Sequence, residues 1–216
     1  MRAVVLSHRG VADELGHIGT WLEGRGAAVT RIHREDSPAI PPADLLVVLG
    51  SPDSVATDHC RPAAAAEIES VREWVASDRA FIGICFGAQV LARALGGTVS
   101  RMPDTFRRFT EFALVDEAPR ELEGRWAVWH EDAITAPPGS EVLARLPHAD
   151  AVFRAGRAWG LQPHVEFDAT IVENLGTIVG LPDADWWPLH EDLRAAEHEL
   201  ARRTHCLLDR IADDIL

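Results

Sequence analysis

The sequence predicts an α/β fold in which a mostly parallel central sheet is flanked by helices and continues into an antiparallel extension. In the first half of the chain, short β-branched runs alternate with segments of helical spacing, which is typical of a parallel sheet covered on both faces. In the second half, short strand-like runs follow one another with turns between them, which favours antiparallel pairing. The 216 residues show no linker, repeat or low-complexity segment, so we expect a single domain over residues 1–216.

The first half supplies the parallel part of this sheet. Strands are expected at residues 3–8, 27–33, 45–50 and 80–84. The run LLVVLG is continuously apolar, as in a strand buried on both faces. A first helix is expected to have Asp13 as its N-cap and to stop at Gly26, and Pro62 opens a second. A third helix follows the fourth strand and ends at Gly96 and Gly97.

The second half supplies the antiparallel extension. Strand-like runs occupy residues 108–116, 125–130, 141–145, 151–156 and 158–167. We expect all of them to join the same sheet. Apolar residues at helical spacing between Leu193 and Ile211 then predict a final helix.

Composition excludes several classes of function. All 21 basic residues are arginine, so the chain has no lysine for a P-loop or a Schiff base. A net charge of −13 without a basic run makes nucleic acid a poor partner. No apolar run is long enough for a membrane helix, and the first residues do not form a signal sequence. We therefore expect a soluble, cytoplasmic protein with neither a membrane nor a nucleic-acid partner.

The three cysteines are Cys60, Cys85 and Cys206. They are too few and too scattered for a disulfide framework, and no zinc-binding spacing of cysteine or histidine is present. We assign no metal and no cofactor.

The strongest chemical signal is FIGICFGAQVLARALGG, residues 81–97, in which Cys85 lies between Gly83 and Gly87. G-x-C-x-G is the cysteine form of a strand-to-helix nucleophile elbow, in which the glycines permit a turn too tight for side chains. The thiol then stands at a helix N-terminus, where the helix dipole favours the thiolate. The main-chain N–H of Phe86 is placed to meet a developing oxyanion. The alternative is a structural cysteine buried beside packing glycines.

A thiol nucleophile needs a base and a group that orients the base. His164 ends a strand-like run, and Glu166 follows two residues later, so both side chains project to the same side of an extended backbone. A second oxyanion donor is expected from Gly50 and Ser51, which follow the central strand at the sheet edge where α/β proteins gather their sites. Taken alone, His164 and Glu166 are also consistent with a surface hydrogen bond, and the Gly50-Ser51 loop is consistent with an ordinary turn between a strand and a helix.

Together these segments resemble the class I glutamine amidotransferases that use a Cys-His-Glu triad, and they match best the stand-alone members related to the glutaminase domain of GMP synthase. LVVLGSPDSVATD resembles the oxyanion strand of that family, GICFGAQVLARALGG its elbow, and WGLQPHVEF its His-x-Glu strand. WHEDAITAPPGSEVLA resembles a segment that carries H-x-D in the family. The resemblance implies a flavodoxin-like sheet.

The resemblance also implies roles for individual residues. Cys85 would attack the side-chain amide of glutamine, His164 would pass a proton to the departing ammonia, and Glu166 would orient His164. The implied substrate is glutamine or another γ-glutamyl compound.

Further residues of the site follow from the same resemblance. Gln89 would hold the glutamate moiety, while His130 and Asp132 occupy the H-x-D positions in the site wall. Two positions depart from the family pattern, since Val165 stands where proline is usual and Ser51 where a second glycine is usual. We expect the valine to shift Glu166 and the serine to restrict the oxyanion loop.

Three functions fit these observations. The first is a glutaminase that releases ammonia for a separate synthetase subunit. The second is a γ-glutamyl peptide or γ-glutamyl amine hydrolase that uses the same triad on a larger leaving group. The third is a non-catalytic module that binds a partner or senses oxidation through its thiol, and such a module has no need of a complete triad.

Overall fold

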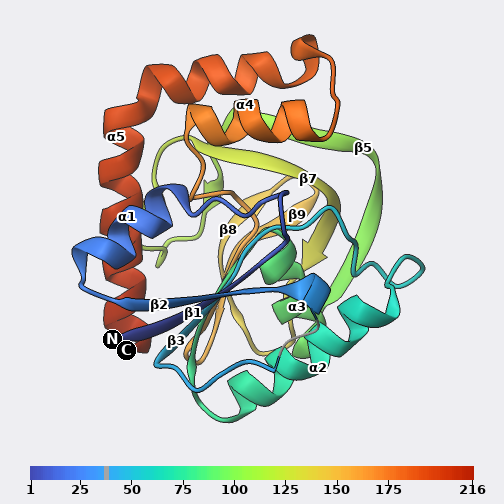
Figure 1. Ribbon diagram of the computed structural model, residues 1–216, viewed down its shortest axis with the longest axis vertical. Helices are drawn as coiled ribbons and strands as arrows, with labels where there is room; N and C mark the ends of the chain where they lie inside the picture. Colours follow the sequence, from blue (N-terminus) through green and yellow to red (C-terminus); the bar gives the residue numbers. More distant parts are fainter. Residues whose placement is uncertain (37–38) are drawn as a thin grey trace.

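The computed structural model describes residues 1–36 and 39–216, and a sheet of eight strands runs through its centre (Figure 1). These strands are β1 (Arg2–Ser7), β2 (Ala28–His33), β3 (Leu45–Val48), β4 (Ala80–Ile84), β6 (Ala113–Leu114), β8 (Glu141–Leu146), β9 (Ala149–Ala155) and β10 (Ala158–Leu161). They lie in the order β2-β1-β3-β4-β10-β9-β8-β6, parallel from β2 to β10 and antiparallel from β10 to β6. The predicted α/β class and its antiparallel extension are confirmed.

Helices cover both faces of the parallel strands. They are α1 (Gly16–Gly24), α2 (Pro62–Ala76), α3 (Phe86–Ala94), α4 (Ala169–Ile178) and α5 (Asp183–Ile215), with short 3-10 turns η1 (Arg34–Asp36) and η2 (Arg120–Leu122). Successive side chains of a strand point to opposite faces, so Val5 packs in the core shared with α1 and α5 while Val4 packs in the core shared with α2 and α3. The sheet is thus buried on both sides, and its carboxyl ends form the edge where a site can open.

The expected strand 125–130 and the first residues of the expected strand 108–116 do not join the main sheet. β5 (Thr98–Thr110) and β7 (Trp126–Thr135) pair with each other in a separate antiparallel ribbon. β5 is exposed over most of its length, so it lacks the continuous apolar face of a buried sheet strand, and its register with β7 shifts between Arg101 and Phe106. The expectation that all second-half strands extend one sheet is therefore wrong for residues 125–130 and 108–110, while residues 113–114 of the run 108–116 do join it as β6.

The N-cap expected for the first helix is also wrong. α1 begins at Gly16, and the residue before it, Leu15, makes no side-chain cap. Asp13 instead accepts hydrogen bonds from Ser7 Oγ at 2.8 Å and from His33 Nε2 at 3.1 Å, and it also pairs with Arg31. A carboxylate that binds two strands is not available to cap a helix, so the loop before α1 is fixed to the sheet.

The expected final helix is present, but it is longer than the apolar pattern indicates, and α4 precedes it without having been predicted. The Asp168 side chain caps α4 by accepting from the Ile171 N–H at 2.8 Å. α4 packs against α5 through Gly176, where an added Cβ would lie 2.5 Å from the Trp186 ring.

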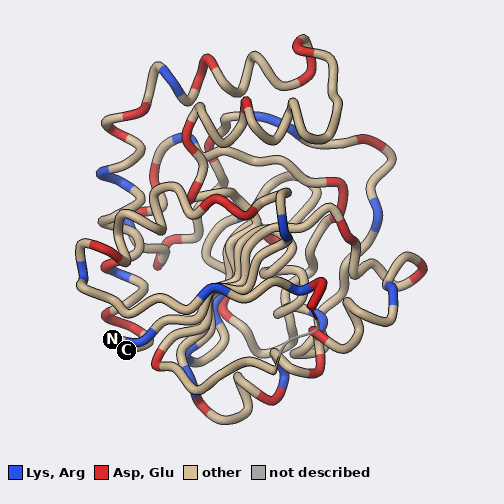
Figure 2. The backbone as a smooth tube through the Cα atoms, in the orientation of Figure 1, with Lys and Arg blue, Asp and Glu red and all other residues tan. Residues whose placement is uncertain are grey.

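Charged residues of both signs alternate along the outer segments, while the central strands are nearly free of charge (Figure 2). Among the residues that the structure describes, no helix combines the length and the apolar character needed to cross a bilayer.

Candidate active site

The turn from β4 to α3 is forced by two close backbone approaches. A Cβ on Gly83 would lie 2.5 Å from the Gly87 carbonyl carbon, and a Cβ on Gly87 would lie 2.1 Å from the Val48 carbonyl oxygen. Cys85 takes φ 50° and ψ −103°, a conformation that L residues rarely adopt, and its N–H donates to the Leu161 carbonyl at 2.7 Å. The glycines are therefore sterically required, and they place Cys85 immediately before the first turn of α3.

His164 and Glu166 lie on one side of the chain that leaves β10. Oε1 of Glu166 accepts a hydrogen bond from Nδ1 of His164 at 2.7 Å, and both side chains are buried. The imidazole stacks on Phe167 with ring centroids 3.9 Å apart. Val165 points to the opposite side into the core, so the valine found in place of proline leaves Glu166 within reach of His164.

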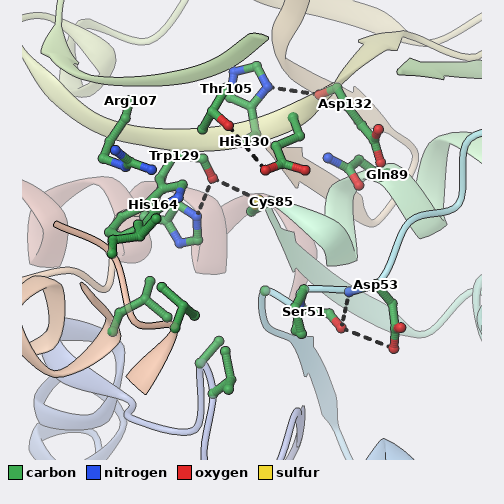
Figure 3. A pocket seen from close by; sticks show the side chains of 18 of the residues that line it. Ser51, Asp53, Cys85, Gln89, Thr105, Arg107, Trp129, His130, Asp132 and His164 are labelled. Carbon is green, nitrogen blue, oxygen red and sulfur yellow. Dashed lines mark hydrogen bonds between the residues drawn. The ribbon is translucent and has the colours of Figure 1, made fainter. Parts of the chain in front are cut away.

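One main-chain carbonyl joins the thiol to the imidazole. The Trp129 oxygen accepts from Nε2 of His164 at 3.3 Å and from Sγ of Cys85 at 3.6 Å (Figure 3). Because Glu166 and the Trp129 carbonyl both accept, the ring nitrogens of His164 act as two donors, which is the protonated form of the ring. Burial lowers the pKa of His164, but Glu166 and Cys85 outweigh it and raise the pKa to about 10.

The loop after β3 is held from behind by a buried arginine. Arg34 donates to the Gly50 carbonyl at 2.8 Å and to the Leu49 carbonyl at 3.2 Å, and it forms a buried ion pair with Glu67 at 3.2 Å. Its guanidinium also lies 4.6 Å from the centre of the Phe86 ring. Arg34 therefore contacts both segments expected to supply oxyanion donors.

The remaining expected residues line the same pocket as the thiol. Gln89, His130 and Asp132 are almost fully buried, and the pocket has a volume of about 250 Å³. His130 donates from Nδ1 to the Asp132 carbonyl at 2.8 Å, and Ser54 donates to the Asp132 carboxylate at 2.6 Å. Burial lowers the pKa of His130 to about 4, so this ring is neutral at pH 7.

The structure also shows contacts that the sequence reasoning missed. Gln162 donates from Nε2 to the Cys85 sulfur at 3.7 Å and is fully buried. Arg34 and Arg107 were likewise not singled out, and Arg107 lies in the pocket wall. Only Gln162 has a local signal, since it lies two residues before His164 and shares its side of the extended chain.

An α/β sheet whose carboxyl edge carries a cysteine elbow beside a buried His-Glu pair has the arrangement that a cysteine nucleophile requires. The chain belongs to the glutamine amidotransferase class-I family, whose profile matches residues 22–173. It is 33% identical over 162 residues to a GMP synthase [glutamine-hydrolyzing] of Aeropyrum pernix and 40% identical over 144 residues to that of Thermus thermophilus.

These alignments cover 69% and 59% of this chain but only 30% and 28% of the two synthases. A crystal structure of a glutamine amidotransferase from Thermotoga maritima superimposes with a TM-score of 0.82 at 21% identity, covering 98% of this chain and 97% of that one. The structural likeness supports the fold, while the sequence relatives support the family.

Proposed function

We propose that this chain hydrolyses the amide bond of a γ-glutamyl compound through a thioester on Cys85. Sγ attacks the amide carbonyl carbon as a thiolate paired with the protonated His164, and main-chain N–H groups of Phe86 and of the Gly50-Ser51 loop hold the oxyanion. As the C–N bond breaks, His164 gives its Nε2 proton to the departing amine. Water then attacks the thioester and gives a proton to the now neutral His164, so that the C–S bond breaks, glutamate is released and the thiolate beside protonated His164 is restored.

The observation that carries this proposal is the Trp129 carbonyl, which receives hydrogen bonds from both the thiol of Cys85 and the imidazole of His164. That shared acceptor holds the two groups at one point of the pocket, with Glu166 behind the ring. Gln89, His130 and Asp132 form the wall against which the glutamyl group would bind.

Glutamine is the simplest acyl donor for this chemistry, and its amine is ammonia. The relatives named GMP synthase [glutamine-hydrolyzing] support glutamine as a substrate, and ammonia would then pass to a separate synthetase subunit. A thiol-sensing module would not require the buried His164-Glu166 pair, because oxidation of the thiol needs no general acid.

The test measures glutamate release from glutamine and from a panel of γ-glutamyl peptides and amines, with wild type, Cys85→Ala and His164→Ala in parallel. Cys206→Ala is the matched control, because Cys206 is exposed and outside the pocket. We expect release from wild type and the control only, with a γ-glutamyl adduct on Cys85 by intact mass. Reversible oxidation of Cys85 that survives in His164→Ala, with no glutamate from any substrate, would support the sensing module instead.

A further inference from the structure

We infer that the leaving-group side of the pocket is a subsite for an apolar α-amino acid, so that the preferred substrate is a γ-glutamyl dipeptide with an apolar second residue. This inference rests on the proposed function, because it concerns the group that departs from the Cys85 thioester. It is carried by the position of His164, by an aliphatic wall whose Ala12 end borders the same glycine as that ring, and by an arginine that forms no ion pair among the residues that the structure describes.

The departing amine must lie beside His164, because that ring supplies its proton. Figure 3 shows His164, Trp129 and Arg107 on one side of Cys85, with Gln89 and Asp132 on the other. The glutamyl group and the leaving group therefore occupy opposite halves of the pocket.

An aliphatic wall made by two segments also lines the pocket, and its members are Val11, Ala12, Leu175, Val179 and Leu181. A Cβ built on Gly50 would lie 3.2 Å from Cε1 of His164 and 3.6 Å from Cβ of Ala12, so the Ala12 methyl and the imidazole border the same glycine and the Ala12 end of the wall is on the His164 side. A free ammonia molecule offers nothing for such a wall to contact, whereas an aliphatic side chain would bury apolar surface against it.

The first segment of this wall is fixed in place. Ala12 has φ 55°, and its neighbour Asp13 is bound to Ser7 and His33. At the end of the loop, the His17 N–H donates to the Glu166 carbonyl at 3.1 Å. The loop is therefore fixed to the sheet and to the residue that orients His164.

Arg107 adds a positive charge to the same half. Its guanidinium lies 4.1 Å from the centre of the Trp129 ring, and Nη1 donates to the Asp185 carbonyl at 2.6 Å. Within the described part of the chain it forms no ion pair, and its buried Nε has no hydrogen-bond partner. Arg101, also in the pocket wall, is by contrast paired with Glu131 and Asp132.

An amine that satisfies both features bears an apolar side chain for the wall and a carboxylate for Arg107. Such an amine is an apolar α-amino acid. The reaction keeps the balance given above: the γ-amide C–N bond breaks, the amino nitrogen takes the proton from His164, and water completes the release of glutamate.

The test uses matched substrates. γ-Glutamyl-leucine carries both features, γ-glutamyl-isoamylamine lacks only the carboxylate, γ-glutamyl-alanine lacks most of the side chain, and glutamine lacks both. We expect kcat/KM for γ-glutamyl-leucine to exceed that for each single truncation by about 10-fold and that for glutamine by about 100-fold. Equal or better use of glutamine would overturn the inference.

Variants test which residue recognises the carboxylate and which recognises the apolar side chain of the leaving group. Arg107→Gln is expected to bring the leucine-to-isoamylamine ratio close to one, and Val179→Asp to reduce the leucine-to-alanine ratio. Ile178→Asp is the control, because Ile178 is 55% exposed and does not line the pocket. An equal loss on all four substrates in Arg107→Gln would place this arginine on the glutamyl side and contradict the inference.

A covalent probe separates failure of this inference from failure of the proposed function. The glutamine analogue 6-diazo-5-oxo-L-norleucine forms a carbon-sulfur bond with an activated thiol, which supplies the proton while dinitrogen departs, and the adduct is read by intact mass. Labelling of Cys85 with no preference for γ-glutamyl-leucine would reject only the subsite. Absence of both labelling and hydrolysis would reject the γ-glutamyl chemistry itself, and the subsite with it.

Discussion

Arg34 donates from Nη1 to the carbonyl oxygen of Gly50 at 2.8 Å, from a position buried behind the loop that lines the pocket. The Gly50 carbonyl and the Ser51 N–H belong to one trans peptide, so holding the oxygen toward Arg34 directs the N–H the opposite way. The serine found in place of a second glycine thus lies in a loop whose peptide is already oriented by a side chain. In the proposed mechanism, Arg34 would be a positioning residue for the oxyanion donor.

Removing this contact is predicted to slow acyl transfer. Arg34→Met alone leaves Glu67 buried without its partner, so the double variant Arg34→Met with Glu67→Leu is the better test. We expect kcat to fall roughly 100-fold with little change in KM, because the loss falls on the transition state.

Alkylation of Cys85 by iodoacetamide provides the control, since that displacement develops no oxyanion. Peptide mass analysis distinguishes Cys85 from the two other cysteines. If alkylation slows as much as hydrolysis, Arg34 supports the fold of the site and does not position a donor.

Glu166→Gln is predicted to reduce kcat by roughly 10² to 10⁴-fold, because a neutral amide neither stabilises the imidazolium nor enforces its orientation. In wild type the pKa of His164 is raised to about 10, so the ring keeps its proton until the pH rises through that value. The alkaline limb of the kcat/KM profile is therefore expected near pH 10, and it should move toward neutrality in the variant. An unmoved limb would mean that another group titrates there.

Gly87→Ala is predicted to destabilise the fold by roughly 2 to 4 kcal/mol, because the new Cβ would lie 2.1 Å from the Val48 carbonyl oxygen. Gly24→Ala is the matched control at the end of α1, where an added Cβ meets nothing within 4 Å. Urea unfolding should show the control unchanged or more stable by up to about 1 kcal/mol. Similar unfolding midpoints for both variants would contradict the close packing of the elbow on β3.

Stability is predicted to fall in mild acid through His130. Burial lowers the pKa of this ring from 6.5 to about 4, so between these pH values the unfolded chain binds a proton that the folded chain does not. The free energy of unfolding is therefore not reduced by this ring above pH 6.5, and it falls as the pH is lowered toward 4. In His130→Asn, the free energy of unfolding from urea titrations should change less between pH 7 and pH 4.5 than in wild type. Parallel curves would assign the acid sensitivity to other groups.

The elbow was predictable from sequence because its chemistry is local: two glycines, a cysteine and a helix start lie within five residues. The pairing of His164 with Glu166 was predictable for the same reason, since alternation along an extended chain places both on one side. Arg34 and Arg107 were not predictable, because each acts on residues that only the tertiary fold brings near. The prediction that Asp13 caps α1 was wrong for a related reason, because a carboxylate that can cap a helix can equally bind side chains of two strands.

The parallel pairing of β10 with β4 has a consequence for how the chain acquires its reactivity. β10 lies more than seventy residues after the elbow, yet its Leu161 carbonyl accepts from the Cys85 N–H, and the segment that follows it carries His164. In a nascent or partly opened chain in which β10 has not docked, Cys85 is therefore separated from His164. Under the proposed mechanism, acylation would therefore wait for the fold, because Cys85 would gain its proton-transfer partner only when the pairing of β10 with β4 has formed.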